Sequence, residues 1–261
     1  MTVNTVDLQI FGIPVYFFCA IIGLVITICV YIALISEKKY DISQSVKILF
    51  LSLFGMIVGC KIFGFLTGVY RCIGNKQKVT FDAILDTGIV FYGGLFGLII
   101  VYSICLKSKK CIVDKNAIDV IAVCIPLFHS IARIGCFFSG CCYGKEYVEP
   151  LAIKYITIIE NEINESLRFP IQLVEALFEF LLFWYLLTLL HNERWQEKKI
   201  LVRYLIFYSI ARFMFEYLRG DVRRGLICGI SFSQGISILI WVNLGFLYLR
   251  RYIISKQKGG V

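Results

Sequence analysis

Residues 13–35 read IPVYFFCAIIGLVITICVYIALI and contain no Asp, Glu, Lys or Arg. A transmembrane helix needs about 20 consecutive apolar residues, so this run is long enough to cross a bilayer once. Because a segment inside lipid must satisfy its own backbone hydrogen bonds, the run predicts an α-helix. The chain is therefore expected to enter a membrane near its N-terminal end.

Six further apolar runs follow the first one. They span residues 47–70, 86–106, 117–137, 171–190, 200–218 and 230–249. The chain is 59% hydrophobic with a mean hydropathy of +0.79, and only 17% of its residues are charged, against about 25% in an average soluble domain. These values exclude a disordered chain, a repeat array and a water-soluble enzyme with one core. The prediction is an all-α, polytopic integral membrane protein with about seven transmembrane helices and a single domain over residues 1–261.

The distribution of charge predicts how the chain is oriented in the membrane. The formal net charge is +9, but the basic residues lie between the apolar runs, which favours membrane anchoring over binding of nucleic acid. Lys and Arg are more frequent in segments 36–46, 107–116 and 191–199 and after residue 249 than in the other loops. The positive-inside rule therefore predicts an outside N-terminus and an inside C-terminus. The one long outside segment, 145–169, is expected to form a lid.

A first polar cluster lies at the outer end of run 117–137. A charged group at the centre of a membrane helix costs about 2.5–3.5 kcal/mol and usually marks a functional site. His129 and Arg133 are four residues apart and share one helix face. The glycine-containing stretch 135–144 follows, which is typical of a broken helix or of a loop that approaches a ligand closely. The structural alternative is an interfacial Arg that extends to the lipid headgroups.

A second polar cluster lies on run 200–218. Tyr208, Arg212 and Glu216 recur every four residues and share one stripe of a helix. One interpretation is that Arg212 and Glu216 neutralise each other. The other is that Arg133 and Arg212, both in the outer half of the membrane, bind a phosphate group, because guanidinium groups can bind phosphate through paired hydrogen bonds.

Weaker polar signals lie on other runs. Segment 170–175 contains Gln172 and Glu175, which are either helix-start residues or part of a site. Gly93 and Gly94 fit either close helix packing or a binding site. The remaining candidates are single polar side chains in or beside apolar runs: Tyr16, Lys61, Gln234 and Ser237.

In their order along the chain, these motifs resemble those of the bacterial phosphatidylglycerol–prolipoprotein diacylglyceryl transferase family. Arg133-Ile134-Gly135 followed by Gly144 is similar to the family's signature Gly-Arg-Ile-Gly-Asn-Phe segment. Arg168-Phe169-Pro170 with Gln172 and Glu175 is similar to its Arg-His-Pro-Ser-Gln-Leu-Tyr-Glu motif. The other matching positions are Ile13-Pro14-Val15-Tyr16, Gly59-Cys60-Lys61, Tyr92-Gly93-Gly94, the stripe of Tyr208, Arg212 and Glu216, and Gln234 with Ser237.

The resemblance implies an enzyme of lipoprotein biosynthesis in the bacterial cytoplasmic membrane. Such an enzyme moves a diacylglyceryl group from phosphatidylglycerol to the lipobox cysteine of a prolipoprotein signal peptide, forms a thioether and releases glycerol phosphate. These two substrates and membrane lipids are the expected partners, and no cofactor or metal is expected. The expected catalytic residues are Arg133, Arg212, Glu216, Tyr208 and Tyr92. The expected substrate-binding residues are Tyr16, Lys61, Gly93, Gly94, Gly144, Gln172, Glu175 and Gln234.

The acceptor thiol also has to lose its proton. Tyr92 replaces a His of the family, and a tyrosine with a pKa near 10 is a poor general base near neutral pH. A cysteine thiol has a free pKa of about 8.5 and reacts as the thiolate. We hypothesise that His129 is a catalytic residue that supplies the missing imidazole. The alternative is that a pair of arginines alone lowers the pKa of the substrate thiol.

Three cysteines in the signature segment leave other functions open. Cys136 replaces the family's Asn, Cys141 replaces its acidic residue, and Cys142 follows directly. This C-x4-C-C arrangement with His129 nearby could bind a soft metal such as zinc, or form a redox disulfide on the oxidising side. The alternatives to the family reaction are therefore an enzyme for another lipid substrate, or a non-transferase membrane protein that uses this cluster for metal or redox chemistry.

Overall fold

The structure of the chain is a computed structural model. It describes residues 2–4, 9–10, 13–74, 76, 90–108, 112–148, 150–159, 162–192, 199–220 and 226–258.

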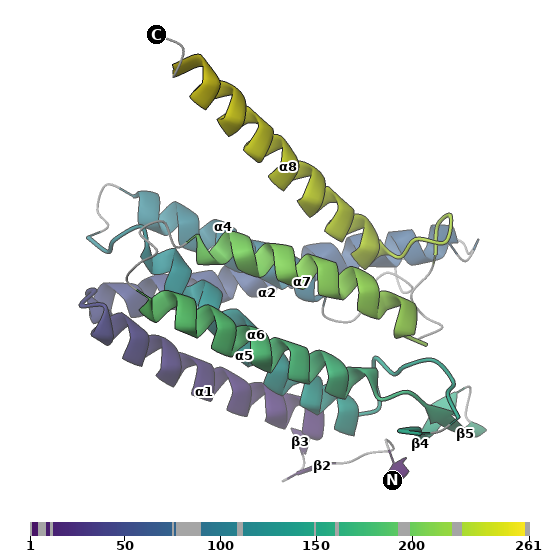
Figure 1. Cartoon of the computed structure of the whole chain (residues 1–261). Helices are drawn as coiled ribbons and strands as arrows, with labels where there is room; N and C mark the ends of the chain where they lie inside the picture. Colours follow the sequence, from purple (N-terminus) through teal and green to yellow (C-terminus); the bar gives the residue numbers. More distant parts are fainter. Residues whose placement is uncertain are drawn as a thin grey trace.

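Seven α-helices in the described segments overlap the seven predicted runs (Figure 1). They are α1 (Val15–Glu37), α2 (Ile42–Gly74), α4 (Phe91–Lys107), α5 (Ala117–Phe138), α6 (Ile171–His191), α7 (Ile200–Phe215) and α8 (Phe232–Lys258). Five are long and apolar enough to cross a membrane by length and composition: α1, α2, α5, α6 and the segment Phe232–Ile254 of α8. Helices α4 and α7 are shorter, with 17 and 16 residues. Residues 86–89, the start of the predicted run 86–106, lie outside the described residues.

Successive helices alternate in direction (Figure 1), and contacts between the ends of non-successive helices agree with this. At one end of the bundle, the Tyr70 hydroxyl near the end of α2 donates to the Ile230 carbonyl just before α8 at 2.7 Å, and Gly144 after α5 pairs with Arg219 after α7. At the other end, the Asp119 carboxylate near the start of α5 accepts from the first backbone N–H of α7 at 2.9 Å. This alternation is the arrangement expected of a chain that crosses a membrane repeatedly (Figure 1).

Helix α5 is the central helix of the bundle. Within its most apolar 18 residues 83% are buried, against 22–39% for the four other long helices. Those four helices expose large apolar side chains outward, such as Phe54 of α2 and Phe246 of α8. An apolar outer surface around a polar interior is the pattern of a bundle in lipid.

Helices α2 and α4 approach each other through glycines. A Cβ atom at Gly59 would collide with the Gly93 carbonyl oxygen, and a Cβ atom at Gly97 would collide with the Gly55 carbonyl oxygen. Small residues at such positions let two helix backbones pack closely in a membrane. This contact explains the glycine at position 93 by packing and fixes the position of α4 at the site described below.

The all-α prediction is wrong for three short regions that contain β-strands, at residues 2–4, 9–14 and 153–168. Strands β1 (Thr2–Asn4), β4 (Ile153–Ile159) and β5 (Glu162–Arg168) form a three-stranded sheet in the order β1-β4-β5, with β1 parallel to β4 and β4 antiparallel to β5. Strands β2 (Gln9–Ile10) and β3 (Ile13–Pro14) pair before α1, so the first helix begins at Val15 rather than at residue 13. β4 reads IKYITII, and its β-branched and aromatic residues favour a strand.

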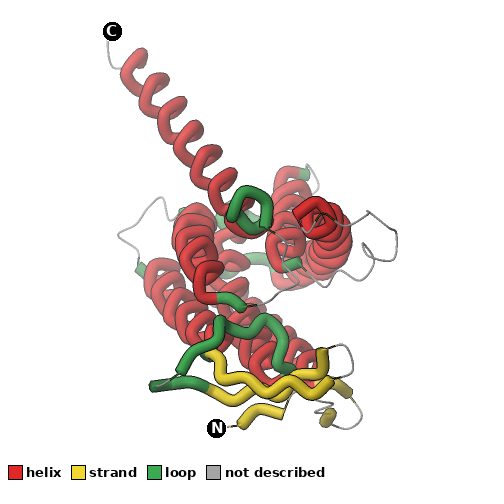
Figure 2. The backbone as a smooth tube through the Cα atoms, turned by 90° about the vertical axis from the view of Figure 1, so that its right-hand side faces the viewer, coloured by secondary structure: helices red, strands yellow, loops and turns green. Residues whose placement is uncertain are grey.

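The predicted loop 145–169 is therefore largely a β-hairpin. Figure 2 shows the three-stranded sheet across one end of the bundle and α8 leaning away from the other helices. We call the end where α1 begins and α5 ends the sheet end. The hairpin is anchored to α5 there, because the buried Tyr155 of β4 packs edge-on against Phe137 with ring centroids 6.2 Å apart.

Candidate active site

A chamber of about 1010 Å³ lies inside the bundle. Its lining comes from α1, α2, α4, α5 and α7, from the segments after α5 and α7, and from the start of α8. Leu24, Leu53 and Leu98 line the part farther from the sheet end, whereas Tyr16 and Arg133 line the part nearest to it. A cavity that is apolar at depth and charged at its outer part suits a ligand with an apolar tail and an anionic headgroup.

Two buried arginines share one carboxylate at the charged end of the chamber. Arg133 Nε of α5 lies 2.7 Å from Glu175 Oε2 of α6, and Arg212 Nη1 of α7 donates to Oε1 of the same carboxylate at 3.3 Å. Both arginines line the chamber, and all three side chains are buried. One anion thus holds two guanidinium groups at the same end of the chamber.

The polar stripe predicted on α7 lies in this site. Arg212 Nη2 lies 2.7 Å from Glu216 Oε2 at the start of the 3-10 helix η1 (Glu216–Leu218), and it donates to Ser233 Oγ at 3.3 Å. Tyr208 is buried and lines the chamber, and its hydroxyl has no hydrogen-bond partner among the described residues. An unpaired buried polar group costs about 1–3 kcal/mol, so this hydroxyl is suited to a ligand oxygen.

His129 lies one turn before Arg133 and contacts it. Its Nδ1 is 3.0 Å from Glu179 Oε1, and its Nε2 accepts a hydrogen bond from Arg133 Nε at 3.1 Å. The ring also stacks on Phe91, with centroids 3.8 Å apart. With both ring nitrogens engaged, the imidazole orients Arg133 in this state and can accept a proton at Nε2 only after Arg133 has turned away.

Comparison with known proteins agrees with the motifs. The family model described as prolipoprotein diacylglyceryl transferase matches residues 4–250. The chain belongs to the prolipoprotein diacylglyceryl transferase family.

Relatives with the name phosphatidylglycerol–prolipoprotein diacylglyceryl transferase match most of the chain. One from Clostridium tetani (strain Massachusetts / E88) is 31% identical over 235 residues, which cover 88% of this chain and 90% of the relative. One from Clostridium perfringens (strain 13 / Type A), a transferase 2, is 30% identical over 254 residues, which cover 96% and 95%. One from Campylobacter lari is 27% identical over 276 residues, which cover 98% and 95%. The resemblance inferred from the motifs is confirmed.

Tyr92 marks where this chain departs from the motif of the transferase family. Its ring is buried and lines the chamber, 5.3 Å from the ring of Tyr208 between centroids. Its hydroxyl lies 2.7 Å from Ser237 Oγ, and Ser237 in turn donates to the Ser233 carbonyl. In this family member Tyr92 therefore links α4 to the start of α8.

Two predicted binding residues, Gln172 and Gln234, are not part of the chamber lining and instead hold neighbouring segments in place. The Gln172 side chain is fully buried, accepts from the Tyr155 hydroxyl at 3.2 Å and donates from Nε2 to the Cys141 carbonyl at 2.8 Å. Burial raises the pKa of Tyr155 to about 12, so its hydroxyl keeps the proton that it donates. Gln234 Oε1 accepts from the Ser231 N–H at 3.0 Å and fixes the start of α8.

Gly144 and Gly93 also serve packing. A Cβ atom at Gly144 would collide with the Phe169 carbonyl oxygen, and one at Gly220 would collide with the Gly144 carbonyl oxygen. This close crossing of three segments brings Arg219 to the chamber lining. Of the other predicted binding residues, the structure places Tyr16, Lys61 and Gly94 on the lining.

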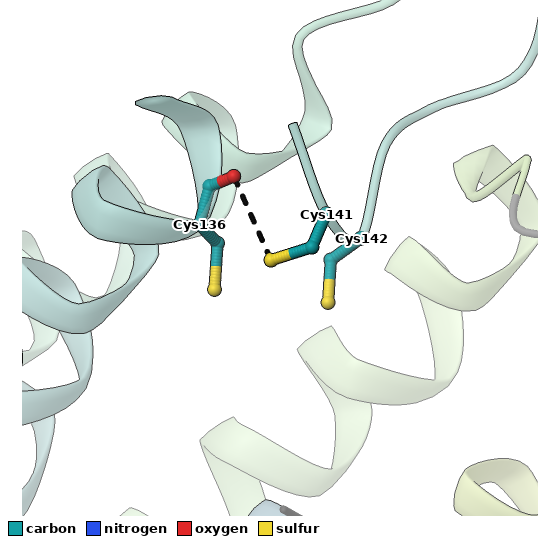
Figure 3. A group of neighbouring side chains, drawn as sticks. All are labelled: Cys136, Cys141 and Cys142. Carbon is teal, nitrogen blue, oxygen red and sulfur yellow. Dashed lines mark hydrogen bonds between the residues drawn. The ribbon is translucent and has the colours of Figure 1, made fainter. Parts of the chain in front are cut away.

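The three cysteines of the signature segment converge at the same end of the chamber (Figure 3). The Sγ atoms of Cys136, Cys141 and Cys142 all lie within 4.8 Å of one another, and the three residues line the chamber. The Cys141 thiol donates a hydrogen bond to the Cys136 carbonyl oxygen at 3.7 Å. His129 is not part of this group, because its nitrogens contact Glu179 and Arg133.

The residues absent from the predicted site include three that contact its charged side chains or line the chamber: Glu179, Arg219 and Ser233. Glu179 follows Glu175 by four residues and so lies on the same face of α6, which is a signal that could have identified it. Arg219 lies directly after the stripe of α7. Ser233 gave no sequence signal of its own.

Proposed function

We propose that this protein transfers the diacylglyceryl group of phosphatidylglycerol to the lipobox cysteine of prolipoproteins. The observation that carries the proposal is the pair of buried arginines, Arg133 and Arg212, held by Glu175 at the charged end of an otherwise apolar chamber. The family match and the names of the relatives give the reaction class. The chamber suits acyl chains in its apolar part and a phosphodiester at the arginines.

In this proposal the arginines stabilise the leaving group. The thiolate of the lipobox cysteine attacks the carbon of the diacylglyceryl group that is bonded to the phosphate oxygen. The C–S bond forms, and the bond between that carbon and the phosphate oxygen breaks to release glycerol phosphate. Negative charge grows on the phosphate oxygens as the C–O bond breaks, and fixed cations aimed at that charge lower the barrier. Glu216 orients Arg212, while the hydroxyls of Tyr208 and Tyr16 are available to headgroup oxygens.

The role of His129 follows from its contact with Arg133. While Arg133 donates to Nε2 the imidazole is a positioning group. When the arginine turns to the phosphate, the lone pair of Nε2 becomes available for the thiol proton. Transfer at a near-normal rate by His129→Ala would refute this base role.

We further propose that all seven helices cross the bacterial cytoplasmic membrane, with the N-terminus outside and the C-terminus inside. The alternating helix directions and the basic segments after α1, α4 and α6 support this orientation. The sheet end then faces the compartment from which a secreted substrate arrives. The hairpin of β4 and β5 would act there as the lid over the charged end of the chamber.

Complementation tests the proposal in cells. The chain is expressed in bacteria depleted of their own diacylglyceryl transferase, and growth and the mobility of a marker prolipoprotein are followed. We expect rescue by the wild-type chain and by the control Arg250→Ala, whose side chain is exposed on α8. We expect no rescue by Arg133→Ala or Arg212→Ala. Absence of rescue by wild-type protein that is present in the membrane would contradict the proposal.

A further inference from the structure

The three thiols at the charged end of the chamber are held in place by the backbone around them. The Cys141 N–H donates to the Cys136 carbonyl at 3.2 Å, and the Cys141 carbonyl accepts from the buried Gln172. Cys142 has a φ of 57°, in the left-handed region. That conformation costs a non-glycine residue roughly 1–3 kcal/mol and persists where surrounding structure enforces it, often at functional sites.

The sulfur positions fit a shared metal ion better than a disulfide. Zn–S bonds of about 2.3 Å in a tetrahedral site place sulfur atoms about 3.8 Å apart. The three sulfurs, within 4.8 Å of one another, reach this geometry through shifts of about 1 Å or less. A disulfide needs Cα atoms about 4.4–6.8 Å apart, whereas the adjacent Cys141 and Cys142 are separated by about 3.8 Å. Pairing Cys136 with either of them would leave the third thiol unused.

We propose that Cys136, Cys141 and Cys142 bind one thiophilic divalent cation, best matched by Zn²⁺, whose fourth coordination position opens to the chamber and takes the acceptor thiol. The binding of the acceptor thiol to this ion rests on the proposed function. Zinc sites with three protein ligands keep their fourth position for water or substrate. All three cysteines line the chamber, as do Arg133 and Arg219. The positive charges of these arginines would stabilise the net negative charge of a zinc ion with three thiolate ligands.

This site lowers the pKa of the acceptor thiol, so the weak base His129 suffices to take its proton. A thiol that coordinates a metal ion loses its proton, and in this proposal the proton goes to Nε2 of His129, which lines the same chamber. The bound sulfur then gives an electron pair to the glycerol carbon, and the electron pair of the broken C–O bond leaves on glycerol phosphate. No electron passes to or from the metal. The neutral thioether product is a weaker ligand than a thiolate, so it leaves the ion.

Metal content tests the site independently of transfer. We expect about one zinc per chain in full-length protein purified without chelators and supplied with Zn²⁺. Cys141→Ser and Cys142→Ser should bind zinc at least about 10-fold more weakly. The control Cys29→Ser, whose thiol is exposed on α1, should retain the wild-type zinc content. Thermal unfolding in detergent checks that each variant is folded.

Wild-type protein with no more zinc than the variants, or with two of the three thiols joined in a disulfide, would overturn the proposal. The open position is tested with Co²⁺-loaded protein. A lipobox peptide should shift the visible cobalt bands, and the same peptide with Ser in place of its Cys should not. Unchanged cobalt bands with the cysteine peptide would overturn the proposal that the acceptor thiol binds the metal ion.

Transfer activity separates this inference from the proposed function. Diacylglyceryl transfer that survives complete zinc removal would overturn the role of the metal while the proposed function stands. Zinc-loaded protein whose cobalt form binds the peptide thiol, yet which transfers no diacylglyceryl group, would support the site and contradict the proposed function.

Discussion

Among single residues, Glu175 is the one that joins the two buried arginines of the chamber. Its two oxygens contact Arg133 and Arg212, which come from different helices. Without this anion two buried cations would face each other, and breaking a buried ion pair by removing one partner is strongly destabilising. The carboxylate is therefore both a structural tie between three helices and the element that orients the proposed phosphate site.

Substitution Glu175→Gln keeps the shape of the side chain and removes its charge. We expect it to lower the free energy of unfolding by about 3–5 kcal/mol, measured by thermal or denaturant unfolding in detergent. The matched control is Glu37→Gln, because Glu37 forms a pair with His191 in which both side chains are nearly half exposed. That change should cost about 0–1 kcal/mol. Equal losses in the two variants would contradict the account.

Arg133→Lys tests the geometry of the phosphate site. Lysine keeps the charge but lacks the planar set of donors that contacts Glu175 and His129. We expect the initial rate of prolipoprotein conversion to fall about 100-fold or more, as when one fixed donor of a transition-state charge is removed. A rate within about threefold of wild type would show that charge alone suffices and that this geometry is not required.

Sequence alone identified most of the charged residues that line the chamber, but not the contacts that each of them makes. Charged side chains inside apolar runs led to Arg133, Arg212 and Glu216, because such residues are costly in a membrane. Gln172 was predicted to bind substrate, and the structure adds a contact that the sequence did not indicate, a hydrogen bond from its side chain to the Cys141 carbonyl. Arg219 was missed because its position depends on a backbone crossing with Gly144, which joins segments far apart in the chain.

At the scale of elements, the contact between α2 and α4 positions one wall of the chamber. The two helices meet along Gly55 and Gly59 on one side and Gly93 and Gly97 on the other. Tyr92 lies at the start of α4, beside these glycines, and lines the chamber. A change in helix spacing would therefore move chamber residues.

Gly59→Val should separate α2 from α4, because the added side chain would meet the Gly93 backbone. We expect a loss of about 1–3 kcal/mol in unfolding free energy, typical of overpacking, with reduced transfer activity. Gly245→Ala on α8 is the control, since a Cβ atom there meets nothing within 4 Å. Unfolding in detergent measures the stability of both variants. If Gly59→Val is as stable as wild type, the glycine at position 59 is not required for the packing of α2 against α4.

The length of the apolar runs predicted the helices well and the strands not at all. Each run is about as long as a membrane crossing, so the helices followed from hydropathy. Strand β4 is seven residues long and pairs with β1, which is separated from it by four of the described helices. Such pairing depends on the assembled bundle and leaves little trace in the local sequence.

At the scale of the whole molecule, alternating helices place the charged end of the chamber and the sheet on one side of the membrane. Reporter fusions test this placement. We expect a periplasmic reporter such as alkaline phosphatase to be active when it is inserted after residue 148 and inactive after residue 258. A reporter that fluoresces only in the cytoplasm should give the opposite result. The reverse pattern would contradict the proposed orientation.

Direct assay of the purified protein tests whether the chamber performs diacylglyceryl transfer. The protein is mixed with phosphatidylglycerol and a lipobox peptide, and the modified peptide and the released glycerol phosphate are quantified together by mass spectrometry. We predict equal amounts of the two products, with neither formed from a peptide that carries Ser in place of Cys. An unmodified cysteine peptide and no glycerol phosphate, from protein shown to be folded, would contradict the account.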